Sequence, residues 1–176
     1  MKTSIWLPDF SWPEPEDKQD QEILAKVHTN EWAAMHVAGE PGEPEYFFTV
    51  GHYLHHQRPE VLVVGAPKLV AQHLLNRVAL HAQGKFPPLQ VGREYPRFID
   101  KLGVMFVPVK PEHYNQYLGF NNWFYGSLQH RYPALQLVWA DMNGAFPWQR
   151  GYDSRFSRLQ PLLGDETLHS TSDRLH

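Results

Sequence analysis

Apolar residues recur at helical spacing in two long stretches of the chain. The first covers residues 17–30, where the apolar side chains fall on one side of a helical wheel. The second covers residues 67–84, with Pro at its first position and Gly at its C-terminal cap. A shorter helical segment begins at Pro111, but two internal glycines argue against one uninterrupted helix. The spacing therefore predicts two or three helices.

Other stretches show the alternation or the continuous apolar run that is typical of strands. Residues 32–37 and 46–50 are predicted strands, joined by a turn rich in Gly, Pro and Glu. Residues 60–66, "EVLVVGA", are almost entirely apolar and are the best candidate for a central strand. Further β-structure is predicted within residues 88–92 and, with a turn in its middle, within residues 97–109.

The segment "LQLVWADMNGAFPW" is predicted to form a β-hairpin. Leu135, Leu137 and Trp139 alternate with the residues between them, which is the period of a strand. The Asn-Gly pair within residues 141–144 suits a hairpin turn, because both residues tolerate a positive φ. Trp148 would then lie on the returning strand.

Together these elements predict an α+β fold with a mostly antiparallel sheet covered by two or three helices. About five to seven strands are expected, in the usual range for a sheet, and a curl toward a barrel is left open. Regular βαβ alternation is missing, which argues against a doubly wound fold. Residues 1–16 are predicted to form an N-terminal arm, residues 17–164 a single domain and residues 165–176 a flexible tail.

Composition narrows the classes of partner. Sixteen Lys and Arg residues against 19 Asp and Glu residues give a net charge of -3, so we expect no general attraction to nucleic acid. The chain has no run of Lys and Arg residues of the kind that binds an anionic membrane surface. It also has no apolar run that approaches the ~20 residues of a membrane span. The chain has no Cys, which excludes disulfides, thiolate ligands and a Cys nucleophile. We therefore expect a cytoplasmic protein.

Histidines cluster in the segment "GHYLHHQRPE". His52, His55 and His56, with Glu60, could supply nitrogen and carboxylate ligands to zinc or iron. Three or four converging ligands are needed, and spacing alone does not show convergence. The alternative is a solvated loop in which Glu60 accepts backbone N–H groups at the start of the strand.

A flavin site is a second hypothesis, because a strand followed by an apolar strand and a helix is similar in topology to FMN-binding split-barrel proteins. Thr49 and Gly51 could allow close approach of the backbone to FMN, and Arg93, Arg97 or Arg150 could hold its phosphate. The alternative is a bulge at Gly51 and arginines that are only surface charges.

Asp141 stands where an apolar strand meets a turn. It could act as a general base, or pair with Arg150 in a cleft between Trp139 and Trp148. It could instead accept hydrogen bonds from nearby backbone N–H groups and so stabilise the turn. The second interpretation is favoured, because the order Asp-x-Asn-Gly is typical of hairpin turns.

Several short motifs resemble the bacterial family known as domain of unknown function 4262. They are Thr49-Val50-Gly51, Pro59-Glu60, Leu74-Leu75-Asn76, Leu135 to Asp141 and Pro147-Trp148. The resemblance extends over about residues 22–164, and the segment from Leu135 is its most specific part. The family pattern usually has Leu after the Gly, where this chain has His52. The resemblance implies an architecture and a set of residues. It does not indicate which activity or which cofactor to expect.

We expect a module that binds a small ligand or a partner in a pocket shared by the segments near Gly51 and Trp148. The residues expected at this site are Thr49, Gly51, His52, His55, Glu60, Trp139, Asp141, Trp148 and Arg150. No catalytic residue is assigned. One alternative is an FMN- or metal-dependent enzyme on a split-barrel-like scaffold. Another is an interaction protein of the immunity or effector type that uses an acidic, aromatic-rich surface.

Overall fold

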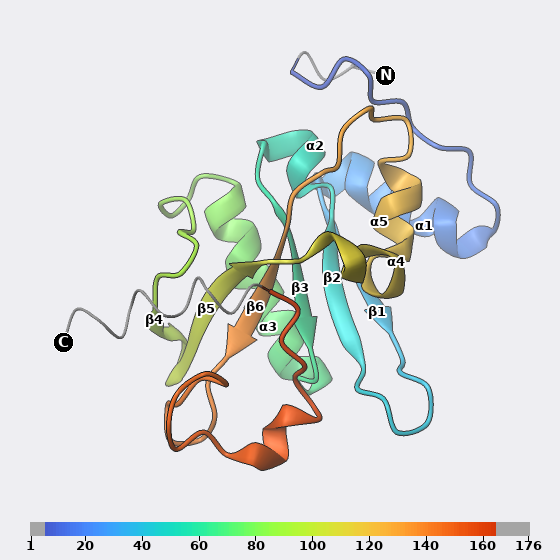
Figure 1. Ribbon diagram of the computed structural model, residues 1–176. Helices are drawn as coiled ribbons and strands as arrows, with labels where there is room; N and C mark the ends of the chain where they lie inside the picture. The colour runs from blue at the N-terminus through green and yellow to red at the C-terminus, as the bar shows by residue number, and fades with distance from the viewer. Residues whose placement is uncertain (1–5, 165–176) are drawn as a thin grey trace.

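The computed structural model describes residues 6–164 and is built around one six-stranded sheet (Figure 1). Along the sheet the strand order is β1-β2-β3-β6-β5-β4. The strands are β1 (Ala33–Val37), β2 (Tyr46–Val50), β3 (Glu60–Val64), β4 (Tyr95–Ile99), β5 (Leu102–Pro108) and β6 (Ala134–Trp139). The helices are α1 (Lys18–Asn30), α2 (His52–His56), α3 (Lys68–Ala82), α4 (Tyr114–Tyr117) and α5 (Gly119–Phe124), with 3₁₀ turns at Pro111–His113 and Ser154–Ser157.

The sheet is open and mostly antiparallel. Neighbouring strands pair antiparallel except β3 and β6, which run parallel with Glu60 opposite Ala134 and Val61 opposite Leu135. Strands β1 and β4 form the two edges, so the sheet does not close. The predicted α+β class is confirmed, and the curl toward a barrel does not occur.

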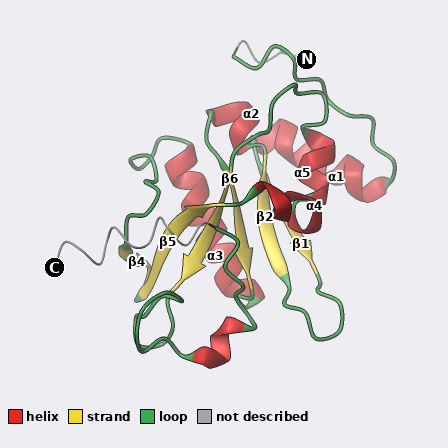
Figure 2. Ribbon diagram, in the orientation of Figure 1, coloured by secondary structure: helices red, strands yellow, loops and turns green. Residues whose placement is uncertain are grey.

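Both faces of the sheet are buried, which explains the continuous apolar run of β3. On one face Val61 and Val63 pack with residues of α3 such as Leu74. On the other face Leu62 and Val64 pack with residues of α1, α4 and α5. Figure 2 shows α3 on one side of the sheet and these other helices on the opposite side.

The long predicted helices are confirmed. Helix α1 begins after Asp17, whose carboxylate accepts a hydrogen bond from the Asp20 N–H at 2.8 Å. Helix α3 begins after Pro67. The segment from Pro111 is interrupted at Leu118, between α4 and α5, as its glycines indicated. Within residues 6–164, no helix is both long and apolar enough to cross a membrane.

The predicted hairpin after β6 is wrong. Strand β6 lies between β3 and β5, so its two edges are already hydrogen-bonded and no edge is left for a returning strand. Residues 141–153 instead form turns below the sheet, at the lower end of Figure 1. Residues 88–92 likewise form no strand and contribute one bridge, from Val91 to Phe106.

Residues 6–12 lie on the domain. Leu7 and Phe10 are buried in the same core as α1 and α5. The Trp6 indole N–H donates a hydrogen bond to the Leu54 carbonyl at 3.1 Å, which ties this segment to α2. The tail expected at residues 165–176 lies outside the described residues.

Candidate functional site

Helix α2 covers the end of the sheet at which β2 ends and β3 begins (Figure 1). The sequence did not predict this helix, because five residues are too few to show a helical period. The chain enters it through Gly51, whose φ is 107°. A Cβ at this position would lie 2.7 Å from the Glu31 carbonyl oxygen, so the position requires glycine.

Glu60, fully buried at the start of β3, faces the first turn of α2. Its Oε1 accepts a hydrogen bond from the Tyr53 N–H at 3.1 Å. Burial raises the pKa of Glu60 well above its ordinary value, although the N–H groups of Tyr53, His52 and Gly51 oppose the shift. The interpretation of Glu60 as an acceptor of backbone N–H groups at the strand entrance is therefore confirmed.

Asn121 in α5 and Tyr125 at its C-terminal end form hydrogen bonds to the backbone of β2 and α2. The Tyr125 hydroxyl accepts a hydrogen bond from the Leu54 N–H at 3.2 Å. The Asn121 amide donates to the Thr49 carbonyl at 2.9 Å, and the Thr49 hydroxyl accepts from the Val61 N–H at 2.9 Å. Thr49 therefore has a structural role in joining β2 to β3 and α5.

His52 points to the other face of the sheet, toward α3, and its side chain is fully buried. Burial, with a smaller effect of His56, lowers the pKa of His52 to about 3, so the ring is neutral at physiological pH. A neutral imidazole offers one N–H donor and one acceptor nitrogen. Neither nitrogen has a hydrogen-bond partner among residues 6–164. The ring contacts that of Trp32, with centroids 5.2 Å apart.

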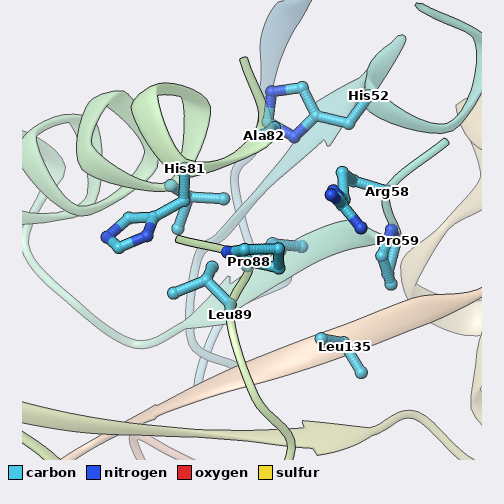
Figure 3. Close-up of a pocket in the computed structure, with 10 residues that line it drawn as sticks. His52, Arg58, Pro59, His81, Ala82, Pro88, Leu89 and Leu135 are labelled. Atoms are coloured by element: carbon cyan, nitrogen blue, oxygen red, sulfur yellow. The ribbon is translucent and has the colours of Figure 1, made fainter. Parts of the chain in front are cut away.

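A cavity of about 70 Å³ lies beside His52, between the start of β3 and the end of α3. Figure 3 shows His52 near Ala82, with Arg58 on the neighbouring wall. The lining residues are His52, Arg58, Pro59, Val61, Val78, His81, Ala82, Pro88, Leu89 and Leu135. Most of these are apolar, and none is acidic. Because β3 and β6 are parallel, Val61 and Leu135 lie opposite one another and together form one wall.

The other histidine of the lining, His81, forms a hydrogen bond within the protein. Its Nδ1 lies 2.7 Å from the Pro87 carbonyl, an acceptor, so Nδ1 carries the proton. The ring stacks on Phe98 at a centroid distance of 5.6 Å, and in Figure 3 it points away from His52 and Arg58. His81 therefore positions the loop at residues 87–89. Of the two histidines in the lining, only His52 has no hydrogen-bond partner among residues 6–164.

The structure does not support a metal site at the histidine cluster. The His52 and His56 rings lie 6.3 Å apart, and His56 Nε2 lies 3.2 Å from a Glu31 carboxylate oxygen. His55 is exposed and lies near the Trp12 ring. Within residues 6–164, no three His, Asp or Glu side chains form a group that could hold a metal ion.

Asp141 lies at the opposite end of the sheet and holds a turn. Its Oδ1 accepts hydrogen bonds from the N–H groups of Asn143 and Ala145, both at 2.9 Å, and its Oδ2 accepts from Asp153 at 2.8 Å. Burial opposes the charge, but these N–H groups lower the pKa of Asp141. The capping interpretation is confirmed. Arg150 is exposed, and the structure contains no Asp141–Arg150 ion pair within the described chain.

The pocket expected between Gly51 and Trp148 does not form. Strand β6 runs parallel to β3, so it carries Trp139 to the end at which β3 finishes, and the Trp139 indole N–H donates to the Val64 carbonyl at 3.0 Å. Trp148 stacks on Phe146 beyond that end, at a centroid distance of 5.2 Å. Thr49, Gly51, His52, His55 and Glu60 are thus together at one end, and Trp139, Asp141, Trp148 and Arg150 at the other.

A second, more open hollow of about 310 Å³ lies beside α5. Three tyrosines, Tyr114, Tyr125 and Tyr132, line it together with Arg131. Its buried hydroxyls have partners within the protein, since Tyr132 donates to the Asn122 amide oxygen and Tyr114 donates to the Tyr132 carbonyl. Among the residues that line this hollow, no buried side-chain nitrogen or oxygen lacks a hydrogen-bond partner as those of His52 do.

The fold and the cavity define a small α+β domain with an open, mostly antiparallel sheet and a partly open cavity, with a mostly apolar lining, at one end. Residues 26–153 match the family described as Domain of unknown function (DUF4262), and the chain belongs to that family. The matched residues include α2, the whole cavity lining and the turn at Asp141. No curated protein and no solved structure matches the chain significantly.

Proposed function

We propose that the protein is a small-molecule-binding module whose site is the cavity beside His52. The observation that carries this proposal is a fully buried imidazole that lines a cavity and whose two nitrogens have no hydrogen-bond partner in the described part of the chain. A buried polar group without a hydrogen bond costs about 1–3 kcal/mol. Such a group at the wall of a cavity is explained when a molecule from outside supplies the missing partner.

The size of the cavity limits the ligand. An apolar cavity of about 150 Å³ binds benzene, and a single water needs roughly 10–15 Å³. The cavity of about 70 Å³ therefore suits a molecule smaller than benzene, or the end of a longer one. Cofactor-sized ligands occupy clefts of about 300 Å³ or more, so this cavity does not suit FMN.

The proposal is tested by titrating ¹⁵N-labelled protein with a panel of small carboxylates, amides, alcohols and imidazole. Long-range ¹H–¹⁵N spectra report directly on the two ring nitrogens of each histidine. At least one class of molecule is expected to shift the His52 nitrogens together with the amide signals of Val61 and Leu135, while the signals of Asp141 and Trp148 stay unchanged.

A variant that fills the cavity provides the control. Ala82→Leu places a larger side chain at the wall of the cavity near the end of α3, and it is expected to abolish the response of His52. Ala25→Leu makes the same change at an exposed position of α1 and should leave the response intact. A panel in which nothing shifts His52, or in which Ala82→Leu binds as well as the wild type, would contradict the proposal.

A further inference from the structure

We propose that the cavity binds a short-chain monocarboxylate, with its carboxylate between Arg58 and His52 and its alkyl group against the apolar wall. This inference rests on the proposed function, because it names the class of ligand for the same site. Three properties of the lining support it: its charge, its unsatisfied donor and its volume.

The charge of the lining favours an anion. Arg58 is the only lining residue that is always cationic, and no Asp or Glu is among the ten residues around the cavity. Among residues 6–164, Arg58 forms no salt bridge. The nearby acids are engaged elsewhere: Glu31 lies against His56, and Glu60 accepts the Tyr53 N–H on the opposite face of the sheet. An anionic group in this cavity would therefore meet an unpaired guanidinium.

The position of Arg58 relative to His52 is set by the backbone. Gln57 ends α2 in a left-handed conformation with φ of 57°, and the Arg58 N–H then donates to the His52 carbonyl at 3.3 Å. The two side chains therefore extend from a single closed turn. A carboxylate has two oxygens that only accept hydrogen bonds. One oxygen suits the guanidinium of Arg58, and the other suits the N–H of the neutral His52 ring.

The rest of the lining selects a short apolar body. Val61, Val78 and Leu135 are buried, and Leu89 is half-buried. Their side chains offer no hydrogen bond to hydroxyl or amino groups on the ligand. With about half the volume of a cavity that binds benzene, the space accepts roughly three to five non-hydrogen atoms, the size of acetate or propionate. The cavity has no room for the additional methylene groups of a longer chain.

The experiment compares propionate with propionamide, a neutral molecule of nearly the same shape, at pH 7 and constant ionic strength. Dissociation constants come from the shifts of the His52 nitrogens and of the Val61 and Leu135 amides. Propionate is expected to bind at least tenfold more tightly than propionamide, because the hydrogen bonds to its carboxylate are charge-assisted. Acetate should bind within about tenfold of propionate, and hexanoate more weakly than either, because the cavity is small.

Variants locate the charge that makes the difference. Arg58→Gln is expected to weaken propionate about tenfold and to leave propionamide unchanged, whereas Arg58→Lys should restore part of the preference. Arg150→Gln removes an equally exposed arginine at the far end of the sheet and should change neither constant. Because Arg58 is exposed, its replacement is expected to leave the fold intact, which a denaturation curve checks.

The outcomes separate this inference from the proposed function. Equal binding of propionamide and propionate at His52, or equal loss of propionate in Arg58→Gln and Arg150→Gln, would overturn the anionic class while the binding module stands. Tighter binding of hexanoate than of propionate would overturn the short chain length. If only an alcohol or imidazole shifts His52, the monocarboxylate is wrong and the binding module stands. If no molecule of the whole panel shifts His52, the proposed function itself fails.

Discussion

The two ends of the sheet differ in how their buried polar groups find partners. At the end formed by Trp139 and Asp141, the polar groups are matched within the protein. Gln160 accepts from the Trp139 N–H at 2.8 Å and donates to the Trp139 carbonyl at 2.9 Å. In the middle of the sheet, where it lies opposite Leu62, Gln136 accepts from the Leu163 N–H at 2.7 Å and donates to the Pro161 carbonyl at 2.8 Å. The hydrogen bonds of these two glutamines join β6 to residues 160–163.

At the end covered by α2, the matching is incomplete. Within residues 6–164, one Glu60 oxygen and both His52 nitrogens have no hydrogen-bond partner, although both residues are fully buried. Buried polar groups in folded proteins are nearly always hydrogen-bonded, so exceptions require an explanation. The motif rich in Trp and Asp therefore serves structure here, and the less distinctive "TVGH" segment leads into the cavity. Substitutions at the Trp139 end should therefore lower stability and leave ligand binding unchanged. Replacement of His52 at the α2 end should abolish ligand binding without lowering stability.

The largest loss of stability is expected for Gly65→Ala, at the Trp139 end. Gly65 has φ of 79°, and a Cβ there would lie 1.9 Å from the Leu159 carbonyl oxygen. Backbone strain and overpacking together should lower the free energy of unfolding by at least about 3 kcal/mol. Urea denaturation measures the loss. Gly144→Ala, with φ of 81° and no atom within 4 Å of the added Cβ, isolates the strain and should cost only about 1 kcal/mol. Equal losses would show that Leu159 can move aside.

Asp141→Ala should have the next largest effect. It removes the acceptor of three backbone N–H groups and should lower the free energy of unfolding by about 2 kcal/mol. Asp141→Asn keeps one oxygen as an acceptor and should lose less. Propionate binding, measured by the His52 shifts, should be unchanged in both variants after correction for any unfolded fraction. A large binding defect in a folded Asp141 variant would show that the two ends of the sheet are coupled.

His52→Leu should have the opposite effect on stability. Replacing an unpartnered buried imidazole with an apolar side chain removes a desolvation cost, so the ligand-free protein should gain about 1 kcal/mol at pH 7. The same change should abolish ligand binding. His73→Leu, at an exposed position of α3, is the control and should change stability by less than about 0.5 kcal/mol. A marked loss of stability in His52→Leu would mean that the imidazole already has a stabilising partner within the protein.

The advantage of His52→Leu should widen as the pH falls. The pKa of His52 is about 3 in the folded protein, below its ordinary value of 6.5. Between these two values the unfolded chain binds a proton that the folded protein does not bind, so the wild type loses stability as the pH falls below 6.5. The limit is about 1.4 kcal/mol for each pH unit. Denaturation curves from pH 7 to pH 4 test this, and a gap that stays constant would contradict the neutral, buried ring.

Glu60→Gln should give the smallest change at pH 7, within about 1 kcal/mol. The folded pKa of Glu60 is raised above 4.5, so the folded protein retains a proton that the unfolded chain has lost. This contribution to stability is complete below pH 4.5 and is lost as the pH rises. The stability of Glu60→Gln relative to wild type should therefore improve from pH 4 toward pH 8. A relative stability that worsens over this range would show that Glu60 is held as a carboxylate.

Much of the fold was predictable because its signals are local. The helices that became α1 and α3, the apolar run of β3 and the alternation of Leu135, Leu137 and Trp139 all follow from side-chain periodicity. The hairpin after Trp139 was predicted wrongly, because Asp-x-Asn-Gly specifies a turn but not the pairing of the strand before it. Asp141 indeed caps that turn, and β6 is paired on both sides by strands that are distant in the sequence.

Of the candidate site, the sequence indicated His52 and Glu60 but not their separation onto two faces of the sheet. The helix that divides them is only one turn long and leaves no periodic signal. Arg58 was not selected, because a single exposed arginine in a loop looks like a surface charge. Leu135 was assigned only a structural role, since its contact with the site depends on the parallel pairing of β3 with β6.

The local elements, the family and the need for glycine and a turn at particular places can be read from the amino-acid sequence, because they depend on neighbouring residues and on steric rules. Which segments share a site depends on how distant strands pair. Pairing Glu60 with Ala134 in parallel brings Leu135 to the cavity and sends Trp139 to the far end. That register is chosen by the burial of both faces of the sheet at once, a sum over many distant contacts that no short stretch of sequence contains.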